Sequence, residues 1–208
     1  MVGMMEELLA STAGIDDEDL LIQITHATWS DISLQMQIVV SVNGTKEDTW
    51  ILSCKNVLAQ SLIREGMFSL QLVDDHPILW EFRQMNASAF FRGIPSNRDA
   101  CVGALYAAHR RTVGFWINFG SQLNNSSRIS ELLETGDGLL AIGPIALLNA
   151  YREALAPYGV DVSIVGEHRA HYWDGNVRKR LTDENVMALL LGSSYLVGIG
   201  FTAEKQAT

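Results

Sequence analysis

The sequence predicts an α+β fold in which an N-terminal, mainly antiparallel sheet of about six strands packs with a C-terminal half of helices and strands. Three observations predict it: apolar residues recur with a period of two before residue 95, helix signals begin at Asn97, and no linker-like tract separates the halves. At 208 residues the chain is long enough to bury a sizeable core. We therefore expect one α+β domain over residues 1–208, with a β-rich part at 1–95 and a mixed part at 96–208.

The clearest strand lies in residues 32–42, where every second residue is apolar. The set is Ile32, Leu34, Met36, Ile38, Val40 and Val42. Such alternation is typical of a strand with one face in a core, and the following Asn43-Gly44 favours a turn. Similar patterns predict strands at 20–26, 50–54, 68–72, 78–82 and 87–91. Residues 57–65 leave room for a short helix. Because the links are short, neighbouring strands are expected to be antiparallel.

Helix signals set the expected order of the second half. Asn97 is a suitable N-cap for a helix that has Asp99 in its first turn and ends at Gly114. Pro144 suits the first turn of another helix. The remaining patterns predict helices at 6–10 and 128–134 and strands at 160–165 and 195–201. They also predict a helix that is capped by Thr182, has Asp183 and Glu184 in its first turn and ends at Gly192.

The charge balance argues against nucleic acid as a partner. The formal net charge is -9, whereas binding to a phosphate backbone depends on Lys and Arg that displace counterions. The longest apolar stretch, residues 139–148, is about half of the ~20 residues needed to span a bilayer, so no membrane partner is expected. The first residues lack the basic start and apolar centre of a signal peptide. We therefore expect a cytoplasmic protein whose two cysteines, Cys54 and Cys101, are buried thiols.

Familiar catalytic and cofactor motifs are absent from the sequence. It contains no phosphate-binding loop of the form G-x-x-x-x-G-K-[ST], no H-E-x-x-H, no C-x-x-C and no G-x-S-x-G. Residues 197–203 mimic the dinucleotide fingerprint, but that fingerprint must open a helix, and few residues remain after Gly200. We therefore expect no cofactor apart from the divalent metal considered next, and the sequence leans away from an enzyme.

The segment EHRAHYWDGNVRKR, residues 167–180, gathers most of the residues that point to function, and we expect it to form a polar loop. His168 and His171 have H-x-x-H spacing, and Glu167 or Asp174 could complete a metal site. Imidazole and carboxylate are common ligands of divalent metals. As one alternative, this pattern predicts a small metal- or His-dependent hydrolase with Glu167 or Asp174 as ligand or base.

The same segment also has the composition of a protein-binding surface. The expected binding residues are Tyr172, Trp173, Arg178 and Arg180, because Trp, Tyr and Arg are enriched in interface centres. The partner would be another protein or a second copy of the chain, whose acidic residues 16–19 offer complementary charge. A competing interpretation places Trp173 over the core and the basic residues in solvent. The leading hypothesis is a non-catalytic binding or assembly module that acts through residues 167–180.

Four further polar and aromatic segments of the sequence are weaker candidates for a functional site. Asp75 could orient His76 as a general base, but Asp74-Asp75-His76-Pro77 is typical of a turn that ends a strand. His26 and His109 continue apolar faces, so we expect hydrogen-bonded histidines there rather than metal ligands. A second alternative function is a small-molecule pocket where the two halves meet. Its lining would be Trp80, Phe82, Tyr106 and Trp116.

Overall fold

The computed structural model describes residues 4–16, 18–44, 46–63, 66–124, 128–181 and 186–206. It has a mixed helix and strand fold, as predicted, and its chain divides into two compact units. The split unit comprises Met1–Leu79 and His171–Thr208, and the inserted unit is Trp80–Ala170. The expected boundary near residue 95 therefore falls inside the inserted unit. The expectation of a single domain over residues 1–208 stays a prediction.

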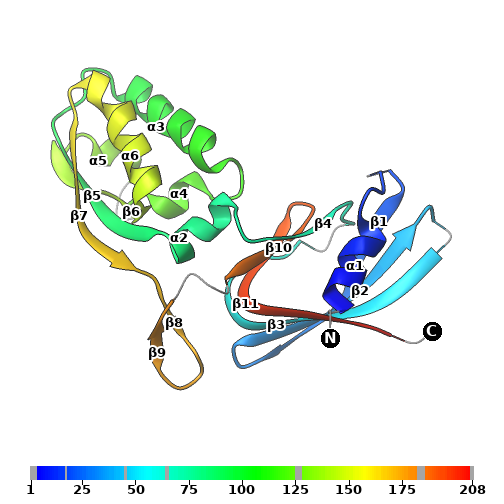
Figure 1. Cartoon of the computed structure of the whole chain (residues 1–208). Helices are drawn as coiled ribbons and strands as arrows, with labels where there is room; N and C mark the ends of the chain where they lie inside the picture. Colours follow the sequence, from blue (N-terminus) through cyan, green and yellow to red (C-terminus); the bar gives the residue numbers. More distant parts are fainter. Residues whose placement is uncertain are drawn as a thin grey trace. The chain divides into compact units, whose positions relative to one another are not determined.

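The split unit is built on a six-stranded antiparallel sheet in the order β1-β2-β3-β11-β10-β4 (Figure 1). Its strands are β1 (Leu20–Ser30), β2 (Ser33–Val42), β3 (Lys46–Ser61), β4 (Leu70–Val73), β10 (Met187–Leu191) and β11 (Ser194–Lys205). A short helix, η1 (Pro77–Leu79), follows β4. The sheet thus combines strands from both ends of the chain, so the N-terminal strands alone do not complete it.

One antiparallel bridge links the two ends of the sheet in the split unit. Ile22 of β1 exchanges two backbone hydrogen bonds, of 2.7 and 2.9 Å, with Met67, which precedes β4. Helix α1 (Met4–Thr12) packs against β11 and β4 and places Leu8 in the core. The alternate apolar residues of β2 point into the same core, as predicted. Trp50 is the largest side chain fully buried there.

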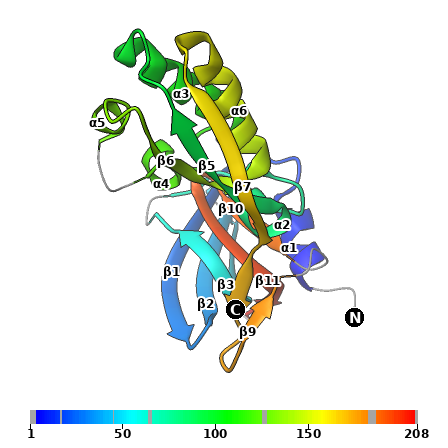
Figure 2. The ribbon, with the colours of Figure 1, turned by 90° about the vertical axis from the view of Figure 1, so that its left-hand side faces the viewer.

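The inserted unit contains a three-stranded antiparallel sheet in the order β6-β5-β7. Its strands are β5 (Met85–Arg92), β6 (Asp137–Pro144) and β7 (Asp161–Arg169). Its helices are α2 (Trp80–Arg83), α3 (Arg98–Val113), α4 (Phe119–Gln122), α5 (Ile129–Leu132), α6 (Ile145–Leu155) and η2 (Ala156–Tyr158). Helices α3 and α6 lie side by side (Figure 2), and their apolar residues share a core with Ala87, Ala89 and Phe91 of β5.

Two predicted helix boundaries are confirmed. The Asn97 side chain accepts a 3.0 Å hydrogen bond from the backbone N–H of Ala100, and α3 ends at Gly114. Helix α6 begins directly after Pro144. These local signals act within one helical turn, which explains why sequence alone locates them.

Three predicted elements are wrong. Residues 57–61 continue β3 instead of forming a helix. Residues 78–82 form η1 and α2 instead of a strand, because Pro77 starts a helical turn and the Nδ1 atom of His76 accepts from the N–H of Ile78. Residues 187–191 form β10 instead of a helix; Ala188–Leu191 are buried on both faces, and such a continuous apolar run resembles a helix in sequence. Thr182, Asp183 and Glu184 lie outside the described residues.

The structure also bears on the predictions for the cysteines, the fingerprint-like segment and membrane-spanning helices. Cys54 and Cys101 are both buried and free, as predicted. Residues 197–203 lie within β11, so the fingerprint-like sequence does not open a helix. Within the described part of the chain, no helix is long and apolar enough to cross a membrane.

Candidate interaction hairpin

Residues 167–180 form a strand end and a hairpin, so the expectation of one polar loop is wrong. Glu167 and His168 belong to β7, whereas β8 (His171–Trp173) and β9 (Arg178–Arg180) form a separate antiparallel pair. This β8–β9 hairpin is drawn in orange in Figure 1. A backbone bond between Asp174 N–H and the carbonyl of Val177 closes its turn at 3.2 Å.

The Asp174 side chain holds the hairpin turn together. Its Oδ1 atom accepts from the backbone N–H groups of Asn176 and Val177 at 2.9 and 2.8 Å. Its Oδ2 atom lies 2.5 Å from Nζ of Lys179. The Lys179 bond, followed by the two N–H bonds, holds the pKa of Asp174 well below its usual range. The turn is therefore preformed by contacts within the hairpin itself, and Asp174 stays ionised at neutral pH.

The register of the hairpin assigns its side chains to two faces. His171 pairs with Arg180, and Trp173 pairs with Arg178, so these four residues share one face, here called the Trp173 face. Tyr172 pairs with Lys179, and both lie on the opposite face. Trp173 is 57% exposed, which contradicts the interpretation of this side chain as a lid on the core. Three of the four expected binding residues therefore occur together, and Tyr172 is separated from them.

The two hairpin faces differ in charge. Lys179 is compensated by Asp174, whereas Arg178 and Arg180 are exposed on the Trp173 face and form no ion pair with any described residue. His171 is exposed on the same face. The Trp173 face is thus a small cationic and aromatic surface on a chain of net charge -9.

The residues proposed for a metal site are divided between the two compact units. Glu167 and His168 belong to the inserted unit, and His171 and Asp174 belong to the split unit. His168 Nδ1 lies 3.0 Å from the carbonyl oxygen of Gly166, and both Asp174 oxygens already have partners. Across the described ranges, no three His, Cys, Asp or Glu side chains gather in a way that could hold a metal ion. The hydrolase alternative stays a prediction without a supporting contact.

The other candidate histidines have structural surroundings. His109 is fully buried and hydrogen-bonded through both ring nitrogens, which confirms its predicted role. His26 is exposed and lies 2.9 Å from the Thr28 hydroxyl; a shift in strand register between Ile24 and His26 removes it from the expected apolar face. His76 lies in the predicted turn.

The aromatic residues expected to line a pocket between two halves all belong to the inserted unit. Trp80 packs against the core of that unit. Tyr106 is half-exposed, and its ring meets Phe119 edge-on at 5.5 Å between centroids. A pocket lined by Trp80, Phe82, Tyr106 and Trp116 stays a prediction.

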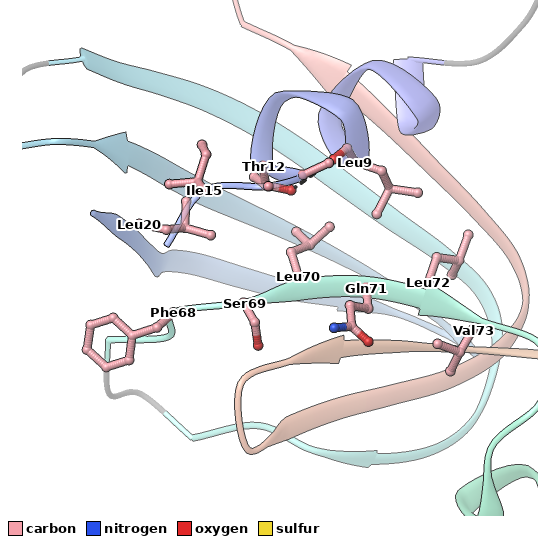
Figure 3. A pocket seen from close by; sticks show the side chains of 12 residues that line it. Leu9, Thr12, Ile15, Leu20, Phe68, Ser69, Leu70, Gln71, Leu72 and Val73 are labelled. Atoms are coloured by element: carbon pink, nitrogen blue, oxygen red, sulfur yellow. Dashed lines mark hydrogen bonds between the residues drawn. The ribbon is translucent and has the colours of Figure 1, made fainter. Parts of the chain in front are cut away.

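A groove that sequence reasoning missed lies between α1 and β4 in the split unit (Figure 3). It has a cavity volume of about 470 Å³, and its apolar lining includes Leu9, Ile15, Leu70 and Leu72. Phe68 is half-exposed at this groove. The sequence marks these residues as apolar, but it has no signal for the space left where a short helix crosses an end strand.

The exposed face of the inserted sheet is a second surface that sequence reasoning missed. Ser88 pairs with Ile142 on one neighbouring strand and with Val165 on the other. Ile142, Val165 and the nearby Phe90 are each about half-exposed. The sequence signal for this surface is a run of consecutive apolar residues, Ala89-Phe90-Phe91, which places apolar side chains on both faces of the strand.

No protein-family model, curated protein or solved structure matches this chain.

Proposed function

We propose that this protein is a non-catalytic binding or assembly module that contacts an acidic protein surface through the Trp173 face. The observation that carries the proposal is the hairpin register, which gathers Trp173, Arg178 and Arg180 on one exposed face. Trp and Arg are the residue types that dominate binding energy in protein interfaces. A half-exposed indole also gains free energy when a partner removes its apolar surface from water.

The hairpin is suited to binding because its turn is already ordered. Asp174 fixes the turn through two N–H groups and Lys179, so little conformational entropy remains to be lost there when a partner binds. Because Asp174 compensates the charge of Lys179, Arg178 and Arg180 are the hairpin charges that attract an acidic partner. Arginine suits this role because its planar guanidinium can bind a carboxylate through two parallel hydrogen bonds.

The proposal is tested by comparing association of the full chain with that of hairpin variants. Self-association is measured by sedimentation velocity, and binding to other sequences by selection from a displayed library of acidic peptides. We expect Trp173→Ala and the double change Arg178→Ala/Arg180→Ala to weaken association at least about tenfold, as expected for hot-spot residues.

Matched controls use residues outside the Trp173 face. Tyr172→Ala removes an aromatic side chain from the opposite hairpin face, and Arg152→Ala removes an exposed charge from α6. Both variants should associate like the unchanged protein. Association that survives the loss of Trp173, Arg178 and Arg180 would contradict the proposal.

A further inference from the structure

The groove between α1 and β4 has the size and lining needed to receive an aromatic side chain. Its volume of about 470 Å³ lies within the range of roughly 300–1,000 Å³ that is common for ligand pockets. Leu9, Ile15 and Leu72 contribute apolar surface, while Thr12 supplies a hydroxyl group (Figure 3). An indole combines an apolar ring with one N–H donor and therefore matches this mixed lining.

Negative charge lies beside the groove. Ile15 and Leu20 both line it, and the chain between them carries the exposed carboxylates of Asp16, Glu18 and Asp19. A 2.9 Å backbone hydrogen bond from Asp19 N–H to the Asp16 carbonyl shapes this segment, here called the acidic turn. The groove and the acidic turn together form a hollow of mixed apolar and polar lining with an acidic rim. The Trp173 face has the complementary combination of an indole and two guanidinium groups.

The two surfaces cannot meet within one chain. Gly175 at the tip of the hairpin lies near Ile32, since a Cβ atom built on Gly175 would lie 3.9 Å from Ile32 Cδ1. Ile32 follows the end of β1, whereas the acidic turn precedes its start. An 11-residue strand is roughly 30–35 Å long at about 3.3 Å per residue. That separation exceeds the reach of any side chain, so the complementary surfaces can only meet between two molecules.

We infer that the partner of the Trp173 face is a second copy of this chain, whose groove between α1 and β4 receives the Trp173 indole while its acidic turn binds Arg178 and Arg180. This inference rests on the proposed function. Charge complementarity, groove volume and the separation along β1 favour this occupant over an unrelated acidic protein. The contact is head-to-tail, because the donor surface and the acceptor surface differ, and such contacts build rings or open chains of subunits.

The test uses variants of the full chain that disable one surface at a time. Arg178→Glu/Arg180→Glu reverses the charge of the donor surface, and Asp16→Lys/Glu18→Lys reverses that of the acceptor surface. Ala13→Trp fills the groove without changing charge, since Ala13 lines it and is exposed. Glu153→Lys/Glu204→Lys is the control, because it makes the same change in net charge as the acceptor variant at exposed positions that belong to neither the acidic turn nor the groove lining. Circular dichroism verifies that each variant is folded.

Sedimentation velocity and native mass spectrometry at low ionic strength measure the association. We expect the unchanged protein and the control to associate, and each of the three surface variants alone to lose at least about tenfold in affinity. Mixing the donor variant with the acceptor variant should restore a 1:1 dimer and nothing larger, because each mixed pair retains one intact donor and one intact acceptor. Added salt should weaken association of the unchanged protein, since exposed charges are screened.

The outcomes separate this inference from the proposed function. If the donor variant loses self-association while the acceptor variant and Ala13→Trp keep it, the groove is not the acceptor and the inference is overturned, but the proposed function stands. A protein that stays monomeric yet binds acidic peptides through the Trp173 face likewise overturns the inference and supports the proposed function. If the donor variant keeps all association of the unchanged protein, both proposals fail.

Discussion

The Nδ1 atom of His109 on α3 lies 2.7 Å from the hydroxyl oxygen of Tyr151 on α6, 42 residues later in the chain. The other ring nitrogen, Nε2, lies 2.7 Å from the carbonyl oxygen of Ile117, which can only accept a hydrogen bond. Nε2 therefore carries the proton and donates a hydrogen bond to the carbonyl oxygen of Ile117, while Nδ1 accepts a hydrogen bond from the Tyr151 O–H. Burial lowers the pKa of His109 and raises the pKa of Tyr151, so both groups are neutral.

Tyr151→Phe should destabilise the protein. The change removes the hydroxyl and leaves the buried Nδ1 atom of His109 without its donor, and such an unpaired buried group costs about 1–3 kcal/mol. Urea denaturation followed by far-ultraviolet circular dichroism measures the free energy of unfolding. Tyr106→Phe is the control, because Tyr106 is half-exposed. Equal stability of the Tyr151→Phe variant and the unchanged protein would show that the bond contributes nothing.

Stability should fall as the pH drops below about 6.5. The unfolded chain protonates His109 near the ordinary histidine pKa of about 6.5, whereas burial keeps the folded-state pKa lower. In that window the unfolded state binds more protons, so acid favours unfolding by up to about 1.4 kcal/mol per pH unit for one group. Burial also lowers the pKa of His76, so this residue contributes to the loss of stability in acid with the same sign.

Denaturation at pH 7.5 and pH 5.5 measures this loss, and His76→Asn separates the two histidines. The variant should keep part of the pH dependence, since His109 retains its burial and both of its hydrogen bonds. Burial raises the pKa of Glu81, and this group changes stability with the opposite sign, so both pH values are also measured in a Glu81→Gln background. In that background, an unfolding free energy that stays constant across this interval would contradict the assignment of a neutral, buried His109.

Gly198→Ala should be destabilising because of Cys54. A Cβ atom at Gly198 would overlap the Cys54 sulfur, where β11 pairs with β3. Overpacking of this kind costs about 1–3 kcal/mol. Adding Cys54→Ala should recover part of the loss, and a double-mutant cycle in thermal denaturation gives the coupling.

Gly200→Ala is the matched control for that cycle. Gly200 lies in the same strand, but a Cβ atom there would meet nothing closer than the Cβ atom of Lys55 at 3.8 Å. It should therefore change stability far less than Gly198→Ala. Additive effects of Gly198→Ala and Cys54→Ala would refute the contact as the cause.

Asp174→Ala should loosen the hairpin and leave the rest of the protein intact. The change removes the acceptor for two turn N–H groups and the partner of Lys179. Faster amide hydrogen exchange at Asn176 and Val177 is the expected result, with global stability within about 0.5 kcal/mol, as for most surface substitutions. Asp174→Asn keeps one acceptor oxygen and should give intermediate exchange. Unchanged exchange in the Ala variant would mean that the turn does not depend on this side chain.

Sequence reasoning succeeded where structure depends on near neighbours. The alternation in β2 and the Asn97 cap of α3 are properties of adjacent residues, so a single sequence exposes them. Strand pairing was not accessible in this way: β11 pairs with β3, more than a hundred residues earlier, and β10 pairs with β4. No local pattern distinguishes those partners from other apolar strands, which is why the insertion of residues 80–170 was missed.

The sequence contains a turn signal for the β8–β9 hairpin that the prediction of a polar loop did not use. Gly175-Asn176 is a frequent hairpin turn, and it lies between the aromatic strand His171–Trp173 and the basic strand Arg178–Arg180. That dipeptide could have predicted which anchors share a face. The groove left no comparable signal, since its walls come from α1 and β4, which are distant in sequence and meet only in the folded unit.

The insertion also sets the order in which the chain can fold during synthesis. All of the inserted unit leaves the ribosome before β10 and β11, the strands that complete the six-stranded sheet. Until then β3, a 16-residue strand, has no partner on the side that β11 later occupies. An unpaired strand edge of that length invites pairing with other chains. Translation that stalls between residues 170 and 194 would therefore release an aggregation-prone chain with a complete inserted unit.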